Sequence, residues 1–161
     1  MASLKKWTTR EVKAVTIRET ECIYGAMDCP SAICAFWRDE VVRSAWFDPG
    51  REALVVGCLD AKLKMRVFSL VTLGIANQTL IHAREVFRPA IITASSSVVL
   101  MHNHPSGNPT PSDADIRATR DIKQAGDIMG IPLLDHVIIG KPSEEHPHGY
   151  VSIKELGLLS F

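Results

Sequence analysis

Short apolar runs and stretches of helical periodicity alternate along this chain. Four apolar runs rich in Val, Ile and Leu predict buried strands: residues 53–59, 66–73, 97–103 and 133–139. Three stretches with apolar residues near helical spacing predict helices: residues 31–45, 83–95 and 113–129. This alternation predicts an α/β fold, in which helices flank a mixed β-sheet.

Glycine and proline divide these elements. The Asp48-Pro49-Gly50 turn leads into the first strand, which we expect to form a hairpin with the second. Pro89 lies inside the second predicted helix and is expected to kink it. Gly130, followed by Pro132, is expected to end the third helix.

The length of the chain fits a single domain. A chain of 161 residues with 46% hydrophobic and 22% charged residues can build one core. We assign the domain to residues 31–161, preceded by an arm or extension of unassigned structure over residues 1–30. No apolar run approaches the roughly 18 residues that a membrane helix needs, and no leader peptide is recognisable, so we expect a cytoplasmic protein without a membrane contact.

The charge balance argues against general binding to nucleic acid. Eighteen basic and eighteen acidic side chains cancel, so no overall positive field attracts a polyphosphate backbone. We predict only weak, steeply salt-dependent DNA binding through the basic arm, at Lys5, Lys6, Arg10 and Lys13. Titration of DNA at several salt concentrations, with and without residues 1–18, checks this. Tight binding at physiological salt that survives the truncation would contradict it.

Two histidines and an aspartate have the spacing of metal ligands. His102 and His104 stand two residues apart at the end of a predicted strand, so their side chains leave the same face with backbones roughly 6.5–7 Å apart. The Pro-rich loop 104–111 then leads to Ser112, and Asp115 lies in the first turn of the following helix. Two imidazoles and one carboxylate leave a fourth position open, as in a catalytic zinc site.

Capping offers a simpler role for part of this motif. Ser112 followed by Asp115 is also the pattern of an N-cap with an acid at the third helical position. Capping alone does not account for two histidines on one face immediately before the loop.

Other cysteines and histidines are weaker metal candidates. The four cysteines, Cys22, Cys29, Cys34 and Cys58, lack Cys-x-x-Cys spacing, so we expect reduced thiols packed as small hydrophobic side chains. The irregular spacing of the first three argues against a second zinc site. His146 and His148 repeat the His-x-His spacing, but within a polar loop over residues 141–149 that is rich in Pro and Gly.

The segment 101–115 resembles the JAMM signature of JAB/MPN metallopeptidases, with every position of that signature filled. The sequence of residues 102–112 resembles that of the RadC-like branch, and segments 74–87 and 131–140 are also similar to this branch. The resemblance spans about residues 50–158, and no counterpart is expected of the helix-hairpin-helix segment found in longer RadC proteins. It implies a JAB/MPN-like single domain and one Zn²⁺ per chain, with three ligands: His102, His104 and Asp115.

The resemblance also implies a general base and an oxyanion donor. Amide hydrolysis needs a carboxylate that takes a proton from water and passes it to the departing amine. The family takes this base from a glutamate that begins an upstream strand, a position matched by Glu52, while Glu85 remains the alternative. Ser112 would donate a hydrogen bond to the developing oxyanion. We expect His136 to be a packed strand residue and not a ligand.

Three functions follow as hypotheses. The first is a zinc-dependent peptidase or isopeptidase that cleaves an amide in a protein, peptide or ubiquitin-like-modifier substrate. The second is a RadC-like factor of DNA repair or mobile elements, with possible nuclease activity. The third is a metal-bound interaction module without turnover. Zinc content, chelator-sensitive peptide cleavage and DNA binding distinguish them.

Overall fold

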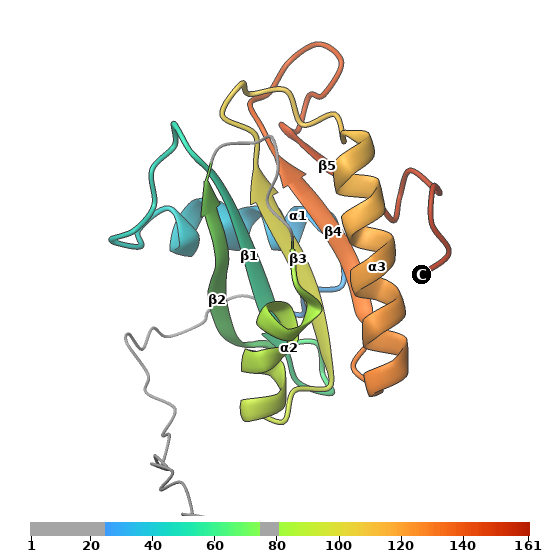
Figure 1. Ribbon diagram of the computed structural model, residues 1–161. Coiled ribbons are helices and arrows are strands. Elements are labelled where there is room, and N and C mark those ends of the chain that lie inside the picture. The colour runs from blue at the N-terminus through green and yellow to red at the C-terminus, as the bar shows by residue number, and fades with distance from the viewer. Residues whose placement is uncertain (1–24, 75–80) are drawn as a thin grey trace, which may run out of the picture.

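A mixed five-stranded sheet organises the chain in this computed structural model, which describes residues 25–74 and 81–161. Its order is β2-β1-β3-β4-β5 (Figure 1). The strands are β1 Glu52–Leu59, β2 Met65–Gly74, β3 Ser97–Asn103, β4 Leu133–Ile139 and β5 Tyr150–Ser152. β1 runs antiparallel to both β2 and β3, β4 runs parallel to β3, and β5 is antiparallel to β4. The predicted α/β class with a mixed sheet is confirmed.

Helices cover both faces of this sheet. They are α1 Pro30–Phe36, which continues into a π-helical turn η1 at Trp37–Val41, α2 Ala83–Ile92 and α3 Asp113–Met129. Helix α1 lies on one face, and α2 and α3 lie on the other (Figure 1). Alternate residues of the central strands therefore enter two separate cores, as the period of two in a strand requires. Val99 and Met101 face the α1 core, whereas Val98 and Leu100 face α2 and α3.

Two of the three predicted helices end earlier than predicted. The first ends with the π-helical turn at Val41, four residues before the predicted end. Helix α2 contains Pro89 and ends at Ile92, where the Thr93 hydroxyl donates to the Pro89 carbonyl at 2.8 Å. Helix α3 has the predicted bounds, and Gly130 takes the left-handed conformation, φ 68°, that a helix C-terminus favours in glycine.

Residues outside the predicted elements also contribute. Met27 is buried, and its N–H donates to the Leu63 carbonyl at 2.8 Å; residues 1–24 of the predicted arm lie outside the described part. Cys34 and Cys58 are buried as expected, but Cys29 is exposed, so the expectation of a packed thiol is wrong there. Cys22 lies outside the described residues. None of the helices in residues 25–74 and 81–161 is long and apolar enough to cross a membrane.

A buried carboxylate joins β4 to the C-terminal segment. Asp135 is 4% exposed and accepts hydrogen bonds from the Ser152 hydroxyl at 2.7 Å and from the backbone N–H groups of His136 at 2.7 Å and Lys154 at 3.2 Å. Removing this carboxylate leaves buried donors without a partner, which costs more than the hydrogen bonds themselves contribute.

We therefore predict that Asp135→Ala lowers the free energy of unfolding by about 2–4 kcal/mol. Urea denaturation measures it, with Asp121→Ala on the exposed surface of α3 as the control. An Asp135→Ala protein as stable as the Asp121→Ala protein would contradict this role.

Candidate metal centre

The candidate ligands meet where β3 ends and α3 begins. His102 is the second-last residue of β3. It lies on the face of the sheet that α2 and α3 cover, and it is 1% exposed. His104 follows directly after the strand, and the loop returns the chain so that Asp115 lies in the first turn of α3. One possible ligand atom from each of these residues lies within 4.8 Å of the other two. The structure thus brings together the three residues predicted from their spacing.

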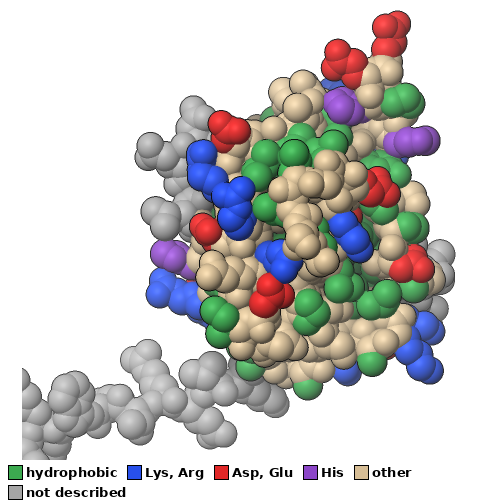
Figure 2. Space-filling model, turned by 90° about the vertical axis from the view of Figure 1, so that its right-hand side faces the viewer, with side chains coloured by type: hydrophobic (Ala, Val, Ile, Leu, Met, Phe, Trp, Pro, Cys, Tyr) green, Lys and Arg blue, Asp and Glu red, His purple; other side chains and the backbone are tan. Residues whose placement is uncertain are grey.

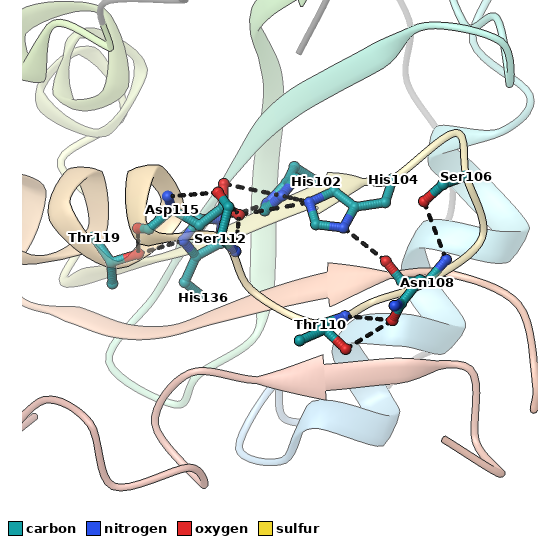
Figure 3. A network of polar contacts seen from close by, with 9 residues as sticks. All are labelled: His102, His104, Ser106, Asn108, Thr110, Ser112, Asp115, Thr119 and His136. Atoms are coloured by element: carbon teal, nitrogen blue, oxygen red, sulfur yellow. Dashed lines mark hydrogen bonds and ion pairs between the residues drawn. The ribbon is translucent and has the colours of Figure 1, made fainter. Parts of the chain in front are cut away.

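The three side chains point at one another (Figure 3). The Nε2 atoms of His102 and His104 are 2.9 Å apart. Asp115 places Oδ1 3.4 Å from Nε2 of His102 and Oδ2 3.5 Å from Nε2 of His104. The side chains of His104 and Asp115 are 17% and 13% exposed, so the cluster opens to solvent on their side.

The donor set fits a bound cation. The Nδ1 of His104 lies 2.7 Å from the backbone carbonyl oxygen of Asn108, and a carbonyl can only accept, so Nδ1 carries the proton. A protonated ring also donates from Nε2 to Asp115, whereas the neutral ring, the form that can bind a metal, presents an unprotonated Nε2 to Asp115 and His102. This is the usual arrangement of a metal-binding histidine, whose second nitrogen donates to an outer partner. The cluster can therefore hold a divalent metal through two imidazole nitrogens and a carboxylate.

Burial and proximity shift the pKa values of the cluster. Burial raises the Asp115 pKa, but the hydrogen bond with His104, the nearby His102 and the bonds from Ser112 outweigh it and hold that pKa below its ordinary value. Burial, with the neighbouring His136, lowers the His102 pKa. Burial also opposes protonation of His104, yet Asp115, the Asn108 carbonyl and Glu52 raise its pKa above the ordinary value. An ionised Asp115 and a neutral His102 are the forms in which these residues bind metals.

Ser112 is the N-cap of α3, as its position in the sequence predicted. Its hydroxyl oxygen accepts from the Asp115 backbone N–H at 3.2 Å, and its own backbone N–H donates to Asp115 Oδ2 at 2.8 Å, which completes a capping box. The hydroxyl also donates to Oδ2 at 2.6 Å. Capping uses the hydroxyl oxygen only as an acceptor, but the hydroxyl proton is taken up by the Asp115 carboxylate, and a hydroxyl that donates to an oxyanion has to give up this bond.

Glu52 lies beside the cluster. It begins β1 two residues before Leu54, which pairs with His102, and β1 runs antiparallel to β3, so the start of β1 meets the end of β3. Burial and the nearby Asp115 raise the pKa of the Glu52 carboxyl, although His104 lowers it. Glu85 instead pairs on α2 with Arg88 at 2.7 Å and with Arg84 at 3.3 Å. These contacts favour Glu52 as the acid nearest the cluster.

Asn103, the residue between the two histidines, holds the backbone around Glu52. Its side-chain oxygen accepts from the Ala53 N–H at 3.0 Å, and its amide donates to the Arg51 carbonyl at 3.0 Å. Both hydrogen bonds flank Glu52, so β3 positions the two histidines and the carboxylate together. Sequence reasoning missed this role, because an asparagine between two histidines shows no partner until the register with β1 is known.

The loop that follows His104 packs against the end of β4. Gly107 accepts from the Lys141 N–H at 2.7 Å, and a Cβ added at Gly140 would collide with the Gly107 carbonyl and lie 2.8 Å from the Pro109 ring. Glycine at position 140 thus permits the close approach of the ligand loop. His146 lies near this loop, 3.1 Å from the Thr110 hydroxyl, and among the described residues the one metal-like cluster excludes both His146 and His148.

Fold and cluster together define the class of protein: an α/β domain with a potential site for a metal at the end of a central strand. The family model of the RadC-like JAB domain matches residues 27–158. The chain belongs to this family.

Curated relatives support the same assignment. A UPF0758 protein of Thermotoga maritima is 46% identical over 109 residues, which cover 68% of this chain and 46% of the relative. A UPF0758 protein of Pelobacter propionicus is 45% identical over 112 residues, 70% of this chain and 46% of the relative. A UPF0758 protein of Methanosarcina barkeri is 39% identical over 109 residues, 68% of this chain and 45% of the relative. The chain therefore spans about half the length of the curated relatives it matches, and their names state no activity.

Proposed function

We propose that this domain is a zinc-dependent peptidase or isopeptidase. The observation that carries the proposal is the cluster of two imidazole nitrogens and the Asp115 carboxylate beside Glu52. His102, His104 and Asp115 would hold the ion. Zinc, when bound there, supplies a Lewis acid that activates water and polarises the amide carbonyl.

The residues of the chain supply the proton transfers. The Glu52 carboxylate accepts a proton from the attacking water and delivers it to the departing amine nitrogen. A raised pKa suits this exchange, since a carboxylate with a pKa closer to the working pH is a stronger base that takes the proton from water more readily and can still pass it on. Ser112 Oγ, released from Asp115, donates to the oxygen of the tetrahedral species. A protein, a peptide or a ubiquitin-like modifier is the substrate class we propose.

Charge distribution gives a DNA-related function less support. On the side of the molecule that lies to the right in Figure 1, acidic and basic side chains are interspersed (Figure 2). Together with the balanced composition, this arrangement offers no extended positive surface on that side for phosphate groups.

The test combines metal analysis with peptide cleavage. Purified protein should contain close to one zinc per chain, and it should cleave peptide or isopeptide substrates in a library with an activity that chelators remove and zinc restores. Zinc binding without cleavage of any amide substrate would favour an interaction module. Metal-dependent cleavage of DNA by the same protein would favour a nuclease.

A further inference from the structure

Behind His102, three groups form a buried chain of hydrogen bonds that the proposed reaction does not use (Figure 3). His102 Nδ1 lies 2.8 Å from His136 Nε2 on β4. His136 Nδ1 lies 2.6 Å from the Thr119 hydroxyl on α3, and that hydroxyl donates to the Asp115 backbone carbonyl at 2.6 Å. His136 is 1% exposed and Thr119 is fully buried.

The carbonyl at one end determines the direction of every hydrogen bond in this chain. A carbonyl oxygen only accepts, so the single hydroxyl proton of Thr119 is used at Asp115. The Thr119 oxygen must then accept, and His136 donates to it from Nδ1. A neutral His136 has a lone pair at Nε2, which accepts from Nδ1–H of His102. The remaining nitrogen of His102, Nε2, is left unprotonated and faces His104 and Asp115.

We propose that Thr119 and His136 are positioning residues that hold His102 in the tautomer able to bind a metal through Nε2. The inference rests on the metal centre of the proposed function, and it explains why His102 adopts the tautomer that can bind a metal. It also connects two ligands, since Thr119 lies one helical turn after Asp115 and bonds to its carbonyl. A histidine takes the place that a carboxylate or carbonyl usually fills behind a metal-binding imidazole.

The second ligand shows why such a device is needed. The proton of His104 is held by a backbone carbonyl, that of Asn108, whereas His102 is 1% exposed and reaches another imidazole instead. An imidazole either donates or accepts at the same nitrogen, so His136 alone leaves the tautomer of His102 open. The hydroxyl of Thr119 removes this ambiguity.

Thr119→Val and Thr119→Ser form the matched pair for the test. Valine keeps the branched shape but provides no hydroxyl, so His136 can carry its proton on Nε2 instead of Nδ1. His136 then donates to Nδ1 of His102, and the proton of His102 moves to Nε2, the nitrogen that would bind the metal. Serine keeps the hydroxyl. In competition with a zinc chelator, Thr119→Val should bind Zn²⁺ about 10- to 100-fold more weakly than wild type, and Thr119→Ser should stay within a few-fold of wild type. Equal affinity of the valine and wild-type proteins would overturn the proposal.

A measurement on the wild type needs no variant to fold. The ¹⁵N chemical shifts of the His136 ring distinguish its tautomers, and we expect the proton on Nδ1 in both the zinc-free and the zinc-loaded protein. A proton on Nε2 of His136 would overturn the proposed tautomers. Neither measurement depends on turnover. A protein that binds zinc but cleaves nothing would refute the peptidase proposal, and the ¹⁵N shifts of the His136 ring would still test the proposed tautomers.

Discussion

Glu52→Gln should lower the rate of amide hydrolysis by about 10²–10⁴-fold while zinc stays near one per chain. Glutamine keeps the size and hydrogen-bonding capacity of glutamate but cannot accept a proton. The contacts of Glu52 with the cluster are electrostatic, and Glu52 is not among the three candidate ligands. Rates must be compared on folded, metal-loaded protein, because lost zinc would have the same effect as a lost base.

Glu85→Gln is the matched control for this experiment. Its carboxylate pairs with Arg88 and Arg84 on the surface of α2, so the rate should stay close to that of the wild type. If Glu85→Gln abolishes cleavage and Glu52→Gln does not, the base is assigned wrongly although the metal centre stands. Full activity in both variants would refute the water-activation mechanism.

Zinc content should fall from near one per chain to a small fraction in either His102→Ala or Asp115→Ala. Each change removes one of the three protein ligands that we propose, and a site with two protein ligands binds zinc weakly. Metal analysis after gel filtration, with a fixed concentration of competing chelator, measures the loss. A circular dichroism spectrum should show that both variants keep the fold.

Two residues of the same types outside the cluster serve as controls. His148 stacks on Tyr150 at the far end of the 141–149 loop, and Asp113 is an exposed acid in the first turn of α3. His148→Ala and Asp113→Ala should keep near-stoichiometric zinc. Full occupancy in His102→Ala would show that the ion binds elsewhere.

Local patterns in the sequence determined the central strands and the helix that carries Asp115. Strand β3 and helix α3 have their predicted bounds, because a continuous apolar run, a capping box and a C-terminal glycine are signals that neighbouring residues carry by themselves. The histidine pair could be predicted for the same reason, since the period of two in a strand places both rings on one face. The short strand β5 has no such signal in its three residues.

Tertiary structure decided which distant groups surround these ligands. The sequence alone left Glu52 and Glu85 as alternative bases, and only the antiparallel register of β1 on β3 brings one of them beside the cluster. Asn103 shows its role only when Arg51 and Ala53 pair beside it. Hydrogen-bond partners 17 to 52 residues apart have no local signature, because strand order and register, and not spacing along the chain, bring them into contact.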